Sequence, residues 1–382
     1  MFASHFLWAM GQGLYQYTWP IHVRNLGGGA VELGFLTMCT FLVSAACVIP
    51  GGLLTDILDR RRLLIIGWSA AVPAPLLFTI ARSWQALIPG QILFGLNMLP
   101  LPALQAYVMD AVHPSRRAYL YSVISAAFYL GMTISPGMGG LIAAHFSMRA
   151  VFWLACAFYA ISTLVLLPVS PQQPPPRAPV GHGSRLGWDG RFAAICALFA
   201  MMVFAQNVSH QFATPYFQDV LGLGVTAVGF LGSLTSFGMF LLAILLGRYG
   251  DRAGRWRAVL LSLAVMAGAP AILLVSRSLH LTWLAALLRG YNGVPLMTAI
   301  VNEEAGHMGS GKGLGLFNLF ILLSMAAASL AGGRLYEMRP AAPFGATIIL
   351  LIGSGAWILA GRCRPSARGP AIGAKHTSEP GV

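Results

Sequence analysis

The eleven residues GLLTDILDRRR, at positions 52–62, have a counterpart 195 positions later in GRYGDRAGR, at positions 247–255. Glycine, aspartate and arginine keep the same spacing in both copies. The same offset aligns further residues of the two stretches of chain: Gln16 with Gln211, Pro20 with Pro215, Gly27 with Gly222 and Gly34 with Gly229. A shared offset over such a distance indicates that the chain consists of two related halves.

Composition identifies the class of protein. Hydrophobic residues make up 57% of the 382 residues and charged residues only 9%, whereas a soluble domain carries roughly 25% charged residues. The chain is therefore expected to lie in a membrane. Its net charge of +13 comes from 24 basic residues in short clusters between apolar runs, a pattern that favours anionic lipid on the cytoplasmic side over nucleic acid as the partner.

The apolar runs predict an all-α membrane protein. A spanning helix needs about 20 apolar residues, and twelve runs meet that length, near 3–23, 32–55, 63–82, 84–109, 118–144, 149–167, 190–216, 225–248, 257–276, 281–302, 313–336 and 343–361. A proline-rich stretch divides them six and six. We predict an N-terminal six-helix bundle (1–167), a cytoplasmic linker (168–189), a pseudo-symmetric C-terminal bundle (190–361) and a disordered cytoplasmic tail (362–382).

Basic residues also predict orientation. If the loop after the second run is cytoplasmic, that side receives 17 of the 24 lysines and arginines and the other side 6, with Arg289 left inside a run. Because cytoplasmic loops hold the excess of Lys and Arg, both termini are expected in the cytoplasm of a cell-membrane protein.

The two loop stretches resemble the signature G-x-x-x-D-R-x-G-R-R of the major facilitator superfamily. The second copy is closer, since the first has Ile57 and Asp59 in place of the usual Arg and Gly. The resemblance implies a twelve-helix transporter in which these loops form cytoplasmic latches that favour the outward-facing state. The latch residues would be Gly52, Asp56, Arg60, Arg61, Gly247, Asp251, Arg252 and Arg255. The alternative is a set of solvated basic loops.

The fifth run contains GMTISPGMGG, at positions 131–140, which is similar to the G-x-x-x-G-P-x-x-G-G motif of antiporters in this superfamily. Its defining residues here are Gly131, Pro136, Gly139 and Gly140, and Ser135 replaces one glycine. The glycines are expected to pack closely against a helix of the opposite half. The motif favours an exporter, although glycine-rich contacts are common between membrane helices.

Polar residues inside apolar runs are candidates for a solute pathway, because they are costly in lipid unless they face a cavity or each other. The first run contains Gln12, Tyr15 and Gln16, and the seventh contains Gln206, Asn207, His210 and Gln211. In the superfamily these two helices line the central cavity, so the resemblance implies that the two sets face each other and bind substrate. Hydrogen bonding between helices is the alternative.

Arg289 lies well inside the tenth run, in the stretch RGYNG at 289–293, which resembles the R-x-x-x-G cavity motif of the family. Facing the cavity together with Asn292, its guanidinium would bind a carboxylate or phosphate, and the solute would be anionic or zwitterionic. A structural arginine held by backbone carbonyls is an equal alternative.

The expected function is secondary active export of small amphipathic compounds by alternating access, in exchange for protons. None of the acidic residues falls at the middle of a predicted run, so His210 is the candidate for proton coupling, and facilitated diffusion stays open. The alternatives are uptake of an organic anion, a membrane enzyme acting on lipid, and a scaffold that does not transport. We expect a monomer with no cofactor, no metal and no enzymatic activity.

Overall fold

The computed structural model describes residues 1–111, 113, 116–174, 190–304 and 310–360, and regular structure within these ranges is helical. The predicted tail at 362–382 and residues 175–189 of the predicted linker lie outside the described residues. The first six spanning segments consist of α1 (Phe2–Gln16) with α2 (Trp19–Asn25), α3 (Ala30–Thr55), α4 (Arg60–Ala71) with α5 (Pro73–Ile80), η1 (Trp84–Leu87) with α6 (Ile88–Gly95), η2 (Leu96–Met98) and α7 (Leu101–Asp110), α8 (Arg117–His145), and α9 (Met148–Leu164).

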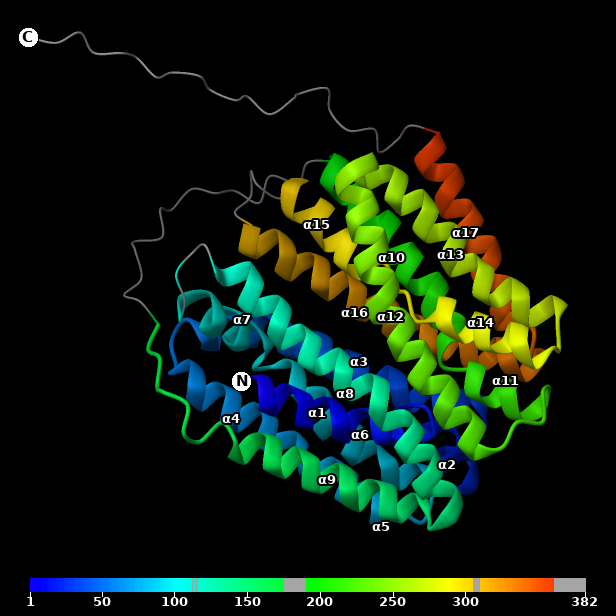
Figure 1. Ribbon diagram of the computed structural model, residues 1–382, viewed down its shortest axis with the longest axis horizontal. Helices are drawn as coiled ribbons and strands as arrows, with labels where there is room; N and C mark the ends of the chain where they lie inside the picture. Colours follow the sequence, from blue (N-terminus) through cyan, green and yellow to red (C-terminus); the bar gives the residue numbers. More distant parts are fainter. Residues whose placement is uncertain (112, 114–115, 175–189, 305–309, 361–382) are drawn as a thin grey trace, which may run out of the picture.

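The second six spanning segments repeat this plan. They consist of α10 (Gly190–His210) with α11 (Ala213–Asp219), α12 (Val225–Ala253), α13 (Arg255–Val275), α14 (Leu279–Arg289) with α15 (Val294–Glu304), α16 (Ser310–Met338) and α17 (Ala342–Leu359). Ten described segments are long and apolar enough to span a membrane, and α9 is a shorter apolar helix. Together with α1–α2 they confirm the twelve-helix, two-bundle fold, and Figure 1 shows the two bundles against each other.

The first and seventh spanning segments are interrupted at positions that the repeat makes equivalent. The first breaks between Gln16 and Trp19, and the seventh breaks between His210 and Ala213. Pro20 and Pro215 follow the two breaks, and proline cannot donate the backbone hydrogen bond that a continuous helix needs. Each break lies beside the polar residues that the sequence singled out, an arrangement typical of transporter binding sites.

The bundles contact each other through α3 with α16 and through α8 with α12. Gly140 of α8 lies directly against Gly229 of α12, because a Cβ built on Gly140 would come within 2.8 Å of the Gly229 Cα atom. Gly131 and Gly139 differ from expectation, since both pack on α1 of their own bundle. The fifth-helix motif therefore holds α8 between two neighbours, and Gly140 and the Pro136 carbonyl are the members of the predicted set that meet the opposite bundle.

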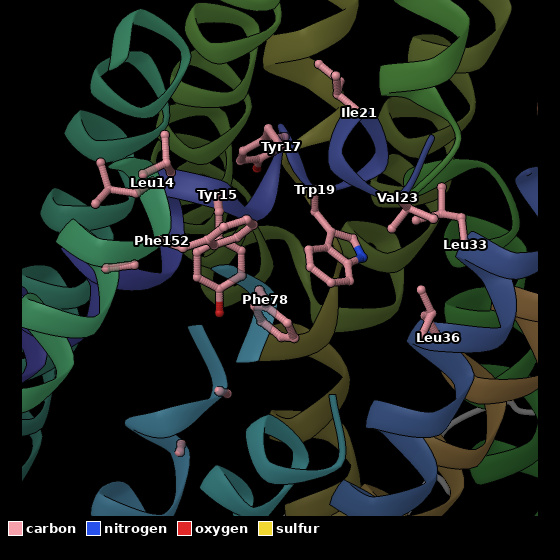
Figure 2. Close-up of a cluster of buried hydrophobic side chains, with 14 of the residues drawn as sticks. Leu14, Tyr15, Tyr17, Trp19, Ile21, Val23, Leu33, Leu36, Phe78 and Phe152 are labelled. Atoms are coloured by element: carbon pink, nitrogen blue, oxygen red, sulfur yellow. The ribbon is translucent and has the colours of Figure 1, made fainter. Parts of the chain in front are cut away.

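An aromatic core fixes the α1–α2 break inside the N-terminal bundle. Figure 2 shows Tyr15, Trp19, Phe78 and Phe152 gathered at this point. The ring centroids of Trp19 and Phe78 are 4.7 Å apart, and those of Tyr15 and Phe152 are 5.6 Å apart. All four side chains are buried. Burial of such large rings stabilises the irregular backbone next to them.

Candidate transport cavity

A cavity of about 360 Å³ lies between the two bundles. Segments from both halves line it, which is the arrangement expected of a site used by two moving bundles. Its lining includes eight of the nine residues that the sequence predicted for substrate binding: Gln12, Tyr15, Gln16, Gln206, Asn207, His210, Gln211 and Asn292. The structure thus brings together the two predicted polar sets from the first and seventh segments.

Several lining residues were missed by the sequence analysis. They are hydroxyl, aromatic and thioether side chains together with one further amide: Tyr17, Trp19, Thr37, Thr40, Phe41, Gln91, Phe94, Met132, Thr214, Thr235, Ser236, Met239 and Met325. Gln91 carried a usable signal, since it is a carboxamide inside the fourth apolar run. The aromatic and methionine residues carried none, because within an apolar run they cannot be told from core residues.

Hydrogen bonds to other side chains orient several of the carboxamides around the cavity. Gln12 Nε2 donates to Gln16 Oε1 at 3.3 Å, and Gln211 Nε2 donates to Ser329 Oγ at 3.1 Å. The hydroxyl of Thr40 donates to Gln91 Oε1. An amide group offers two donors and an acceptor oxygen with two lone pairs. Each of these side chains is therefore oriented by one bond and keeps further hydrogen-bonding capacity for a solute.

Tyr17 links the two bundles at the break in the first segment. Its hydroxyl lies 3.2 Å from Ser236 Oγ on α12, and its carbonyl accepts a hydrogen bond of 2.9 Å from the Thr214 hydroxyl on α11. A Cβ on Gly232 would collide with the Tyr17 ring. Tyr17 therefore closes this part of the cavity between the bundles.

An ion pair joins the bundles beyond Tyr17. Arg24, in the last turn of α2, donates two hydrogen bonds of 2.7 and 2.5 Å to the carboxylate of Asp219, the last residue of α11. The Tyr336 hydroxyl of α16 donates to the same carboxylate at 2.7 Å. Positions 24 and 219 are separated by 195 residues, so this pair connects equivalent positions of the two halves. The end of the molecule that contains it is called here the outer end.

Arg289 lies outside the cavity, contrary to the expectation that it faces the solute. Its side chain is buried in the C-terminal bundle, 5.4 Å from the ring centroid of Phe217, and Nη1 donates to the carbonyl of His210 at 3.4 Å. A cation–π contact contributes about 0.5–2 kcal/mol, less than the several kcal/mol that burial of an ion costs. The carbonyl end of α10, which carries partial negative charge, supplies further stabilisation. This geometry favours the alternative of a structural arginine.

Two of the four predicted latch arginines, Arg60 and Arg255, form ion pairs within their own bundles. Arg60 Nη1 donates to Asp110 at 2.5 Å and to the Ala106 carbonyl at 3.2 Å. Arg255, its equivalent in the second half, lies 2.5 Å from Glu303 and donates to the Ala299 carbonyl at 3.1 Å. Neither acidic partner belongs to the repeated motif, so its spacing did not predict them. These residues define the motif end, opposite the outer end.

The other predicted latch residues lie near the surface of the motif end. Arg61 donates to the Leu167 carbonyl, and Asp56, Asp251 and Arg252 are exposed. A Cβ on Gly52 or on Gly247 would have no atom within 4 Å. In this conformation neither glycine is in close helix contact. Within the described ranges, no three His, Cys, Asp or Glu side chains gather to hold a metal ion.

Comparison with known proteins agrees with this geometry. The family model described as Major Facilitator Superfamily matches residues 1–329 and, in a second match, 196–379. Multidrug resistance protein 1 of Bacillus subtilis (strain 168) is 23% identical over 374 residues, covering 91% of this chain and 92% of that protein. Quinolone resistance protein NorA of Staphylococcus aureus (strain MRSA252) is 25% identical over 159 residues, covering 41% of this chain and 40% of NorA.

A solved structure has the same fold. The crystal structure of a mutant of the nucleoside transporter NupG superimposes with a TM-score of 0.76 at 12% identity, covering 94% of this chain and 97% of that one. At this level of identity the likeness concerns the fold alone. The family match, which extends over most of the sequence, establishes membership: this multi-pass membrane protein belongs to the major facilitator superfamily.

Proposed function

We propose that the protein exports small amphipathic compounds by alternating access, with the two bundles rocking around the cavity between them. The observation that carries this proposal is the cavity itself. Aromatic and methionine side chains give it an apolar lining, and carboxamides from both bundles give it hydrogen-bonding groups. Its size falls in the range of small-molecule sites, about 300–1,000 Å³. Such a lining suits compounds that are part apolar and part polar.

The orientation in the membrane is part of the proposal. The excess of basic residues supports a cytoplasmic motif end, with both termini on that side of the cell membrane and anionic lipid against it. Bundle contacts at Arg24–Asp219, Tyr17–Ser236 and Gly140–Gly229 then lie toward the outside. Because the bundles are held together on the outside, the molecule would be in an inward-facing state and could receive a compound from the cytoplasm.

Export has more support than uptake of an organic anion. The hypothesis of anion uptake depended on a cavity-facing Arg289. That guanidinium is instead buried and donates to the His210 carbonyl at the end of α10. Two relatives are named for drug resistance, one of them similar over nearly its whole length. The fifth-helix motif adds to this support. We therefore take the exporter as the working function of a monomeric carrier.

His210 is the proposed coupling residue. It is the last residue of α10, beside the break in the seventh segment, and its side chain lines the cavity. Imidazole is the side chain whose charge changes most readily near neutral pH. Protonation of His210 from one side and release to the other would couple proton entry to solute exit.

Flux measurements in proteoliposomes with an imposed pH gradient test the proposal. The panel contains amphipathic dyes of different charge and labelled organic anions, and the proteins are wild type, His210→Ala, Arg289→Ala and the exposed control Gln105→Ala. We expect dyes of at least one charge class to move against counterflowing protons, His210→Ala to abolish the dependence on the gradient, and Gln105→Ala to match wild type. Movement of anions alone, lost in Arg289→Ala, would replace export by anion carriage.

A further inference from the structure

The wall of the cavity is rich in carboxamides that come from four different spanning segments. Gln12 and Gln16 lie on the first segment, Gln91 on the fourth, Gln206, Asn207 and Gln211 on the seventh, and Asn292 on the tenth. Thr37, Thr40, Thr235 and Ser236 add hydroxyl groups to the lining. A carboxamide can donate or accept a hydrogen bond. This wall therefore offers a solute many hydrogen bonds without preferring either sign of charge.

Aromatic rings and thioethers complete the lining. Tyr17, Trp19, Phe41 and Phe94 contribute rings, and Met132, Met239 and Met325 contribute thioethers. Aromatic rings favour offset or edge contact with another ring, and methionine adapts to rings of different outline. The volume of about 360 Å³ lies toward the lower end of the range of small-molecule sites, about 300–1,000 Å³. The space suits a solute of one or two rings.

The charges of the region are directed away from this space. The guanidinium of Arg289 is engaged with the His210 carbonyl and the Phe217 ring, and the Arg24–Asp219 pair neutralises itself at the outer end. Within the described residues, the lining contains no Asp, Glu, Lys or Arg side chain, and its imidazole, His210, would carry a charge only in the proton-loaded part of the proposed cycle. An ion entering the cavity would give up hydration without meeting an opposite charge, and burial of an unpaired charge is unfavourable.

We propose that the cavity selects uncharged, ring-containing solutes that carry several hydrogen-bonding groups, and that it discriminates against both carboxylates and fixed cations. This rests on the proposed transport function and names its substrate class. Gln16 is a specificity-determining residue in this view. Its Oε1 atom accepts from Gln12 and it is only half-buried in the lining. A carboxylate at this position would keep that bond and add a negative charge to the wall.

The test compares three tritiated naphthalene derivatives. Each carries one carboxamide and differs in its second group, which is another carboxamide in the uncharged compound, a trimethylammonium group in the cation and a carboxylate in the anion. Initial rates are measured in proteoliposomes of the full chain, with protein-free liposomes subtracted. We expect wild type to move the uncharged compound at least about tenfold faster than either ion, since a poorly compensated buried charge costs more than one tenfold step in binding.

Gln16→Glu tests the cause of the selection. This variant should gain transport of the trimethylammonium compound, to within about threefold of the uncharged one, while the carboxylate stays excluded, because a nearby opposite charge compensates the cation. Gln105→Glu, the same substitution at an exposed position of α7 outside the cavity, should behave as wild type. Thermal unfolding of both variants establishes that they are folded.

Three results would overturn the inference. Equal wild-type rates for the cation and the uncharged compound would remove the selection. A Gln105→Glu variant that gains cation transport to the same degree as Gln16→Glu would remove the role of Gln16 in it. Transport of charged dyes without any naphthalene derivative would leave the proposed transport function in place and remove the substrate class. If neither dyes nor derivatives move, the proposed function itself fails.

Discussion

The two ends of the molecule use equivalent residues in opposite ways. At the outer end, Arg24 and Asp219 occupy equivalent positions of the two halves and bind each other, so their ion pair crosses between bundles. At the motif end, Arg60 and Arg255 are also equivalent, yet each pairs inside its own bundle, with Asp110 and Glu303. Contacts that cross between bundles must break when the bundles separate, whereas contacts inside a bundle can persist.

Contacts between the bundles and contacts inside a bundle should therefore affect different properties of the protein. Outer contacts bias the balance between conformations, because they exist in one state and are lost in the other. Ion pairs inside a bundle stabilise the moving parts themselves. Substitutions at the outer end should therefore change transport or accessibility with little effect on folding, and substitutions at Arg60 or Arg255 should first change stability.

The largest effect is expected at the contact of α8 with α12. In Gly229→Leu the new Cβ would lie 2.7 Å from the Gly140 Cα atom and from the Pro136 carbonyl oxygen, so the helices must move apart. Overpacking costs about 1–3 kcal/mol, and a bias of that size changes a conformational equilibrium about 5- to 150-fold. We expect transport in proteoliposomes to fall at least about tenfold.

Gly353→Leu is the matched control for that substitution. It introduces the same side chain into α17, where a Cβ at position 353 would have no atom within 4 Å. Its transport and its elution on gel filtration should match those of wild type. Normal transport by Gly229→Leu would show that close packing of these two helices is not needed for the cycle.

The next effect is a difference between equivalent residues at the motif end. The Arg60 side chain is 7% exposed and also donates to Gln172, whereas that of Arg255 is 34% exposed. Hydrogen bonds to charged groups contribute about 1.5–3 kcal/mol when protected and less when solvated. Arg60→Ala should therefore lower the melting temperature in detergent more than Arg255→Ala does. Equal losses would mean that burial does not distinguish the two pairs.

Sequence patterns identified the fold and most polar cavity residues for a definite physical reason. Carboxamides such as Gln12 and Gln206 stand out in an apolar run because lipid cannot satisfy them. Tyr17 gave no such signal, since its ring is equally suited to a core, and its role depends on hydrogen bonds to another bundle. The sequence left open whether Arg289 faces the cavity or is a structural arginine, because its contacts with the His210 carbonyl and the Phe217 ring depend on tertiary structure. The partners Asp110 and Glu303 required tertiary proximity that spacing alone does not supply.

A smaller effect is expected when the outer ion pair is removed. Asp219→Asn leaves Arg24 without its counter-charge, and the pair is about one third exposed, so the loss should be about 0.2–1 kcal/mol. The outer end should open more often by about 1.5- to 5-fold. The measurement is labelling of Gln16→Cys by an impermeant thiol reagent from outside, in a chain whose native cysteines are serines.

The charge reversal is the matched test of that pair. Because positions 24 and 219 are equivalent, Arg24→Asp combined with Asp219→Arg should restore labelling to the level of the parent. The Tyr336 hydroxyl, which now donates to Asp219, can accept from an arginine instead. If the double variant labels as fast as Asp219→Asn alone, the pair does not hold the bundles together.

The smallest effect concerns the glycines of the repeated loop motif. In Gly247→Ala, and equally in Gly52→Ala, the added methyl group meets no atom within 4 Å in this conformation. Both glycines lie within helices, where alanine is favoured over glycine by about 0.5–1 kcal/mol. The melting temperature should therefore stay the same or rise slightly.

The turnover of these variants tests whether the motif forms latches in the opposite conformation. In that case another helix must approach these glycines, and the methyl group would obstruct it. Turnover should then fall about two- to fivefold, as a coupling near 1 kcal/mol implies. An unchanged or higher melting temperature together with lower turnover would indicate a contact that these glycines make only in the opposite conformation. Unchanged turnover in both variants, with Gly353→Ala as the control, would leave these loops as solvated basic surfaces.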